Sequence, residues 1–191
     1  MRYLTEDGGF MQEDSASIAT TNVQAEICLL GALLKSPDLY VTYGNFIRSK
    51  YDFSDPAIRF FYDAFETYYV QFSETVDETK MNVFMSQNQE RLEKYKKYKG
   101  WKTIQQYMSL ADENDCKNYF ELVKKYSLLR EYERNGYPID KIVSNKNFEK
   151  MTAGDIYRII RVKADKIHTV INAGAEAVEL TKDTTSHIKS I

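Results

Sequence analysis

The chain has 191 residues, a formal net charge of −2 and a hydrophobic fraction of 43%. A chain of this length has room for one or two domains and can bury a core without disulfide bridges. The small net charge excludes a protein that grips nucleic acid over its whole surface. The two cysteines lie far apart in the sequence and form no CxxC pair. No apolar run reaches the roughly 18 residues of a membrane-spanning helix, and no signal-peptide pattern occurs, so we expect a cytoplasmic protein without membrane contact.

The first helix is predicted over residues 24–36. Its apolar residues recur at helical spacing: Val23, Ile27, Leu30 and Leu34. Thr21 and Gln24 are spaced as a capping box at its start, and Pro37 prevents the helix from continuing past Ser36. Residues 1–20, by contrast, are acidic, contain glycine and show no period, so we expect a flexible N-terminal arm.

The second helix is predicted to begin after Phe53. Asp55 stands at the cap position, and Pro56 stands at the first helical position, where its missing N–H costs nothing. An apolar edge follows at helical spacing: Phe61, Phe65, Tyr68 and Phe72.

Three further helices are predicted at short intervals, over residues 77–86, 90–99 and 101–111. Gly100 separates the last two and is placed to end the fourth helix with a left-handed cap. No stretch alternates apolar and polar residues well enough to predict a sheet. We therefore expect an all-α fold in which residues 21–115 form a globular multi-helix head.

The C-terminal third predicts two longer helices. The first spans residues 115–135, is lined by Tyr119, Leu122, Tyr126 and Leu129, and ends at Asn135-Gly136. A short helical turn is expected over 139–144. The second begins at a capping box, Thr152 with Asp155, and runs to about Ala173. Its apolar stripe is Ile156, Ile160, Ile167 and Ile171. Together they predict a long antiparallel hairpin over residues 116–173.

Residues 174–191 are small and polar, and we interpret them as the start of a linker to a motor domain that is missing here. The motifs of catalysis are absent from the sequence: there is no phosphate-binding GxxxxGK[ST] loop, no GxGxxG, no HExxH and no metal-ligand spacing. We therefore predict no catalytic, cofactor-binding or metal-ligating residue and no enzymatic activity for this chain alone. His168 is an isolated histidine on the second long helix and is interpreted as a surface residue.

One basic segment is a weak candidate for nucleic-acid binding. Residues 90–102 hold six basic side chains against two acidic ones, with Tyr95, Tyr98 and Trp101 among them. Aromatic rings between cations can stack bases while the cations hold phosphates, which makes Lys96, Lys97 and Lys99 the candidates. The alternative, which we favour, is a solvated helix whose tyrosines pack inward.

The order of these segments resembles the N-terminal domain of the DnaB-type replicative helicases. The family's first helix has the form AEqxxLGalLxxP, and residues 25–37 read AEICLLGALLKSP. Its DFxxPxHRxIFxA element is matched at Asp52, Phe53, Pro56 and Arg59, with Ile58 in place of the usual histidine. Gly100 and the helix after it match the next element. The fourth, YaxxVxexaxLRel, is matched by NYFELVKKYSLLREY at 118–132. The resemblance spans roughly residues 22–134. Residues 136–163 resemble variants from phages and Gram-positive bacteria.

This resemblance implies an oligomerisation and partner-docking domain that works in DNA replication as part of a primosome. The implied partners are further copies of the chain, as a dimer or within a hexamer, together with primase and a helicase loader. ATP, magnesium and single-stranded DNA are implied only for the missing motor domain, and no cofactor is expected on this chain. The interface residues that the resemblance implies are Leu122, Tyr126, Leu129 and Arg130. Periodicity adds Ile156, Ile160 and Ile167.

Two alternatives stay open at this point. The two hairpin stripes can close on each other and leave no surface for a partner. The chain can also be a stand-alone helical adaptor, for example a phage protein that mimics the helicase collar and recruits or blocks a host primase or helicase.

Overall fold

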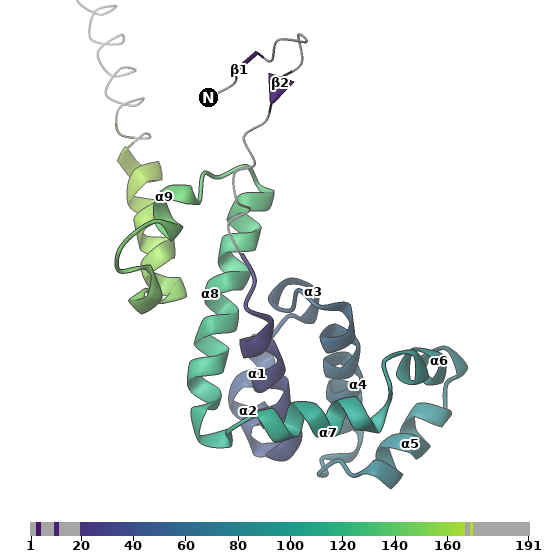
Figure 1. Cartoon of the computed structure of the whole chain (residues 1–191). Coiled ribbons are helices and arrows are strands. Elements are labelled where there is room, and N and C mark those ends of the chain that lie inside the picture. The colour runs from purple at the N-terminus through teal and green to yellow at the C-terminus, as the bar shows by residue number, and fades with distance from the viewer. Residues whose placement is uncertain (1–2, 5–9, 12–19, 167–168, 170–191) are drawn as a thin grey trace, which may run out of the picture. The chain divides into compact units, whose positions relative to one another are not determined.

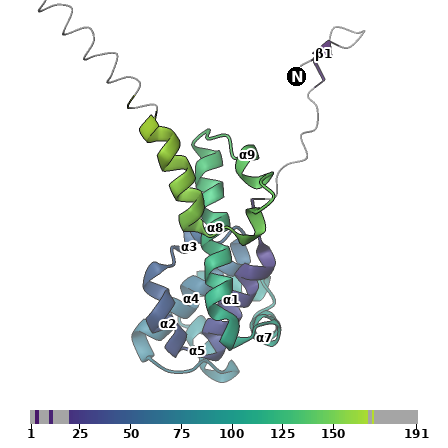
Figure 2. The ribbon, with the colours of Figure 1, turned by 90° about the vertical axis from the view of Figure 1, so that its left-hand side faces the viewer.

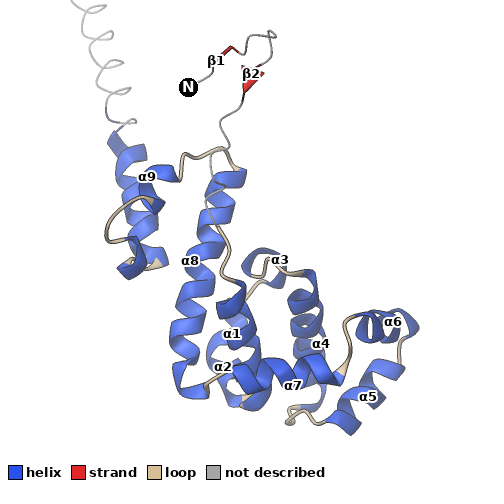
Figure 3. Ribbon diagram, in the orientation of Figure 1, coloured by secondary structure: helices blue, strands red, loops and turns tan. Residues whose placement is uncertain are grey.

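The computed structural model describes residues 3–4, 10–11, 20–166 and 169 (Figure 1). The chain divides into two units, residues 1–149 and residues 150–191. Almost all described secondary structure is helical, so the all-α prediction is confirmed (Figure 3). The exception is an antiparallel pair of two-residue strands, β1 (Tyr3–Leu4) and β2 (Phe10–Met11). Strands of this length are too short to give an alternating pattern, and the sequence did not predict them.

Helix α1 (Val23–Lys35) is the central helix of the first unit and packs against α7 (Trp101–Leu110) and α8 (Cys116–Arg134) (Figures 1 and 2). It ends before Pro37, as predicted. The predicted Thr21–Gln24 capping box is wrong, because Asn22 caps the helix instead: its Oδ1 accepts a hydrogen bond from the Ala25 amide at 3.0 Å. Asn is as good an N-cap as Thr or better, and only Asn22 is placed to satisfy that amide.

Three short elements connect α1 to the next long helix: α2 (Asp38–Tyr43), the 3-10 turn η1 (Gly44–Phe46) and α3 (Ser49–Asp52). The sequence predicted none of them, since three to six residues are too few to show a helical period. Four side chains are exposed between the end of η1 and α3: Phe46, Arg48, Lys50 and Tyr51.

Helix α4 (Pro56–Phe72) begins as the sequence predicts. Asp55 accepts hydrogen bonds from the amides of Ala57, at 2.7 Å, and Ile58, at 3.1 Å. The helix ends at Ser73, which has a left-handed φ of 51°. Three of the four residues on the predicted apolar edge are buried, but the fourth, Phe72, is exposed at the last turn.

The next three helices are also close to their predicted positions: α5 (Glu78–Ser86), α6 (Gln89–Lys97) and α7. The predicted left-handed cap at Gly100 is wrong: α6 ends at Lys97, and Lys99 has the positive φ of 64° that follows its end. Gly100 instead precedes α7 with φ of 54° and ψ of −136°, a conformation that favours glycine. A 3-10 turn, η2 (Glu113–Asp115), leads into α8. Gly136, with φ of 75°, follows the end of α8, and α9 (Asp140–Val143) and the turn η3 (Phe148–Lys150) come next.

The described part of the second unit is a helix over residues 153–166. Its predicted capping box is confirmed. The Thr152 amide donates to Asp155 Oδ2 at 3.0 Å, and the Asp155 amide donates to Thr152 Oγ1 at 3.2 Å. Ile167, His168, Ile171 and the expected linker over 174–191 lie outside the described residues. The antiparallel arrangement of the two long helices stays a prediction.

The core of the first unit is rich in aromatic rings. Phe61 on α4 lies 6.0 Å from the Tyr107 ring of α7 and 6.2 Å from the Tyr95 ring of α6, between ring centroids. Both cysteines, Cys28 and Cys116, are buried and free. Much of the chain's large aromatic content therefore stabilises the head itself.

Candidate interaction surfaces

The candidate functional sites of this chain are exposed apolar surfaces. Within the described residues, no group of three or more His, Cys, Asp or Glu side chains is placed to hold a metal ion. No described helix is long and apolar enough to cross a bilayer. In the described part of the chain, large apolar side chains are nevertheless exposed at ten positions: Val23, Val41, Phe46, Tyr51, Val70, Phe72, Val83, Leu110, Tyr157 and Val162.

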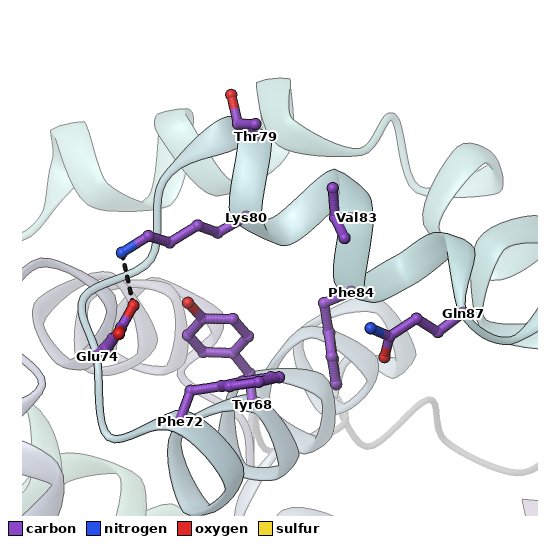
Figure 4. A pocket seen from close by; sticks show the side chains of 8 residues that line it. All are labelled: Tyr68, Phe72, Glu74, Thr79, Lys80, Val83, Phe84 and Gln87. Carbon is purple, nitrogen blue, oxygen red and sulfur yellow. Dashed lines mark hydrogen bonds and ion pairs between the residues drawn. The ribbon is translucent and has the colours of Figure 1, made fainter.

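Two of these residues line a pocket of about 350 Å³ between α4 and α5 (Figure 4). Three aromatic rings gather in it. The Tyr68 ring centroid lies 5.0 Å from that of Phe72 and 5.5 Å from that of Phe84. Phe72 is 41% exposed and Val83, on α5, is 57% exposed. The pocket therefore offers apolar area that the chain leaves uncovered.

Polar groups stand at the rim of this pocket. Lys80 Nζ lies 2.7 Å from Glu74 Oε2, and this contact closes the α4–α5 connection (Figure 4). The same hydrogen bond raises the pKa of Lys80. Gln87 lines the pocket beyond Phe84. An apolar pocket with a few polar groups at its edge can receive an apolar side chain of a partner. The sequence did not reveal it, because Phe72 continues the period of the buried α4 edge.

The α8 residues predicted for an interface are placed differently from one another. Leu129 is completely buried, whereas Leu122 and Tyr126 are half-buried. The Tyr126 ring packs edge-on against Phe148, with 6.2 Å between centroids, and burial raises the pKa of its hydroxyl. Leu129 thus contributes to the interior of a single chain. A contact with a partner is open only to the exposed parts of Leu122 and Tyr126.

Arg130, also predicted as an interface residue, holds parts of its own chain together. Its Nη2 donates to the carbonyls of Tyr51, at 3.0 Å, and Asp52, at 2.7 Å. Its Nη1 donates to the Thr20 carbonyl at 3.2 Å and lies 3.5 Å from Glu26 Oε1. Burial lowers the pKa of Arg130. These bonds join α8 to the start of α1 and to the end of α3.

Two buried acids complete this polar network. Glu26 Oε2 accepts a hydrogen bond from the Ser54 amide at 2.8 Å. Asp52 Oδ2 accepts from the Arg48 amide at 2.7 Å and from Lys124 Nζ at 2.6 Å. Sequence reasoning missed the roles of both acids, because only the fold brings Lys124 to Asp52 and brings Ser54 and Arg130 to Glu26.

On the helix over 153–166, the apolar residues separate into two sets. Ile156 and Ile160, predicted as interface residues, are buried, whereas Tyr157 is 53% exposed and Val162 is 48% exposed. Ile167 lies outside the described residues. The accessible apolar area of this helix therefore belongs to Tyr157 and Val162, which the isoleucine period did not indicate.

The basic segment around α6 has its lysines exposed and its aromatic rings turned inward. Lys96, Lys97 and Lys99 are exposed. Tyr95 is buried and donates its hydroxyl to Asn82 Oδ1 at 2.9 Å, while the Tyr98 ring lies 5.6 Å from that of Phe60. These rings are occupied by the core, so the arrangement agrees with a solvated helix rather than a stacking platform.

The fold has a counterpart among solved structures. It is similar to the N-terminal domain of DnaB helicase from Mycobacterium tuberculosis, with a TM-score of 0.53 and 21% sequence identity. The similarity covers 73% of this chain and 94% of that domain. The chain has a DnaB N-terminal-domain-like fold. No protein-family model and no curated protein sequence matches it. The likeness in fold confirms that part of the predicted resemblance, while a phage or Gram-positive origin stays a prediction.

Proposed function

We propose that the chain is the assembly and partner-docking domain of a hexameric replicative DNA helicase. The observation that carries the proposal is the fold, which matches nearly the whole length of the DnaB helicase N-terminal domain. In this proposal the chain performs no catalysis. ATP, magnesium and the translocated single strand belong to a motor domain that follows it.

Self-association is the first part of the proposed role. The chain buries Leu129, Ile156 and Ile160 within one copy, so these residues stabilise the protomer. Tyr157 and Val162 remain exposed, and we assign the contact with a second copy to them. Both side chains are already about half buried, so covering their exposed halves contributes about 1.5–3 kcal/mol per copy before the cost of association. The expected association of an isolated domain is therefore weak and concentration-dependent.

Partner docking is the second part. We assign primase to the apolar pocket between α4 and α5, where an apolar side chain of the partner would cover Phe72 and Val83. A helicase loader is the other partner included in the proposed role. Both assignments rest on the proposed helicase role and on the uncovered apolar area of the pocket.

The test of self-association is sedimentation velocity over a range of protein concentrations. We expect the weight-average mass of the wild type to rise above the 22.3 kDa of one chain as concentration increases. The Tyr157→Asp/Val162→Asp variant should stay at the monomer mass. Its matched control is Val41→Asp/Val70→Asp, which adds the same charges at exposed positions of the head and should associate like the wild type. A wild type that remains monomeric at every concentration would overturn the proposal.

Leu129→Asp is unsuitable for this purpose. Because Leu129 is completely buried, the substitution places a charge in the protein interior, and the variant is expected to unfold. Loss of association in such a variant would report unfolding rather than a lost interface.

A further inference from the structure

We propose that residues 46–51, which run from the end of η1 into α3 (the η1–α3 turn), bind single-stranded nucleic acid through Phe46, Arg48, Lys50 and Tyr51. This goes beyond the proposed function, in which the single strand belongs to the motor domain. The Phe46 side chain is 64% exposed and the Tyr51 side chain is 44% exposed. Arg48 and Lys50 are exposed between them in the sequence. Two open aromatic rings and two open cations thus lie within six consecutive residues.

The backbone of this turn is fixed from its inner side. The Arg48 amide donates to Asp52 Oδ2 at 2.7 Å, which closes the turn. The Tyr51 carbonyl accepts from Ser127 Oγ at 3.1 Å and from Arg130 Nη2 at 3.0 Å. Both donors belong to α8. A turn held in this way presents its outward side chains without having to order its backbone when a ligand binds.

The two cations are free to meet phosphates. Among the described residues, neither Arg48 nor Lys50 forms an ion pair. Arg48 Nη1 donates to the carbonyls of Asn45, at 3.1 Å, and Ile47, at 3.2 Å, and these bonds orient the guanidinium without neutralising it. Lys50 Nζ lies 5.6 Å from the Tyr51 ring centroid.

The acids near this turn are already engaged. Asp52 is buried and paired with Lys124, whose Nζ lies 2.6 Å from its Oδ2. Arg48, Lys50 and Tyr51 help to line a hollow of about 290 Å³ whose acidic member is Glu66. The Glu66 carboxylate accepts a hydrogen bond from the Tyr40 hydroxyl at 2.8 Å. It is the charge that would oppose a phosphate here.

These features fit a single strand better than other partners. Exposed aromatic rings stack on unpaired bases, and neighbouring cations hold the phosphates on either side. A duplex keeps its bases stacked inside and cannot use the rings. In the basic segment around α6, Tyr95 is buried and Tyr98 and Trp101 are partly buried against the core, so its rings are less open than those of the turn. The turn combines both requirements, and its few contacts predict weak binding without sequence preference.

The experiment is fluorescence anisotropy of a labelled thymidine oligonucleotide titrated with the 191-residue chain at a series of salt concentrations up to about 0.15 M, where variants are compared. Phe46→Ala/Tyr51→Ala should weaken binding roughly ten- to hundredfold, because each lost stacking contact accounts for about a tenfold change or more. Arg48→Ala/Lys50→Ala should weaken binding and reduce the slope of log affinity against log salt by about 1.4, or about 0.7 for each phosphate contact. Glu66→Gln should tighten binding, since it removes the opposing charge.

The matched control is Lys96→Ala/Lys97→Ala/Lys99→Ala, which removes more positive charge from the other basic surface. Its affinity should stay within about threefold of the wild type, since distant exposed charges are largely screened. The substituted side chains of the turn are exposed, so circular dichroism should show intact helices in those variants. Three results would each overturn the proposal: no binding by the wild type, equal loss in the lysine control, or equal competition by duplex DNA. None of them would affect self-association, which sedimentation measures separately.

Discussion

Glu26 and Arg130 show how single residues join distant parts of the head. Glu26 is buried near the start of α1, and its carboxylate receives the Ser54 amide on one oxygen and faces Arg130 on the other. A buried carboxylate that loses its cation is strongly unfavourable. The arginine is therefore required inside the protomer, whatever else it contacts.

We expect Arg130→Met to lower the free energy of unfolding by about 3–5 kcal/mol, because it leaves Glu26 as an uncompensated buried charge. Urea unfolding followed by circular dichroism measures the change. The Glu26→Gln/Arg130→Met double variant should lose less, since the buried charge is removed along with its partner. The extrapolated free energy of unfolding is precise to roughly 10–15%. If the value for Arg130→Met lies within about 1 kcal/mol of the wild-type value, this role of Arg130 is contradicted.

For single residues, the sequence indicated which side chains matter better than it indicated what they contact. Arg130 and Leu129 were expected at an interface because they resemble residues of the helicase family, and Leu129 is instead buried within the chain. The partners of Arg130 are carbonyls about eighty residues away, on a segment that no local pattern connects to α8. Only the packed fold reveals such bonds.

At the scale of elements, the contact between α1 and α7 depends on the absence of a side chain at Gly31. A Cβ built there would lie 2.1 Å from the Tyr107 carbonyl oxygen and 2.9 Å from the Ala111 Cβ. The first of these neighbours is backbone and cannot turn aside. The glycine within the AEICLLGALL segment is thus explained by helix packing.

Gly31→Ala should therefore destabilise the head by about 1–3 kcal/mol or more, as overpacked cores do. Gly154→Ala is the matched control, because the nearest atom to its Cβ is Thr152 Oγ1 at 3.6 Å. Alanine is the better helix former, so this control should be stabilising by up to about 1 kcal/mol. Thermal unfolding of the wild type and the two variants measures whether each substitution raises or lowers the stability. If the Gly31→Ala protein is as stable as the control, the close approach of α1 to the Tyr107 backbone at Gly31 is disproved.

Helix ends were the most predictable part of the elements. Asp55 and Thr152 carry local capping chemistry that acts over three or four residues, and each begins a helix where expected. The short elements between residues 38 and 52 have no such signal. The turn that we propose to bind nucleic acid lies among them, and no local pattern in the sequence marked it.

At the scale of the whole molecule, the buried tyrosines of the core make the free energy of unfolding depend on pH in the alkaline range. Burial raises the pKa of Tyr95 and Tyr107 to about 12 and raises that of Tyr62 further. In the unfolded chain these phenols ionise near pH 10.0. Their contribution is fully present below pH 10 and is lost as pH rises toward 12, because only the unfolded state releases its protons readily.

The free energy of unfolding should therefore fall between pH 10 and pH 12, and urea unfolding at a series of pH values measures the slope. Tyr107→Phe is the informative variant, since it removes one ionisable phenol while keeping the ring. We expect a shallower pH dependence for Tyr107→Phe than for the wild type over the same interval. Identical slopes would show that the Tyr107 hydroxyl reaches water in the folded protein.

The fold class was predictable from the sequence because long helices with apolar faces dominate the chain. The sequence could not show whether a single chain covers those apolar faces. A helix that packs within its own chain has the same spacing of apolar residues as a helix that packs against a second copy. The buried Ile156 and the exposed Tyr157 are adjacent in sequence, and only their exposure separates their roles.

The central claim, that this domain self-associates through its exposed apolar residues, is tested most directly by hydrogen–deuterium exchange at low and high protein concentration. We expect slower exchange at high concentration in peptides that cover residues 153–166, with the buried helices α1 and α4 unchanged. Exchange that is independent of concentration in every peptide would contradict it.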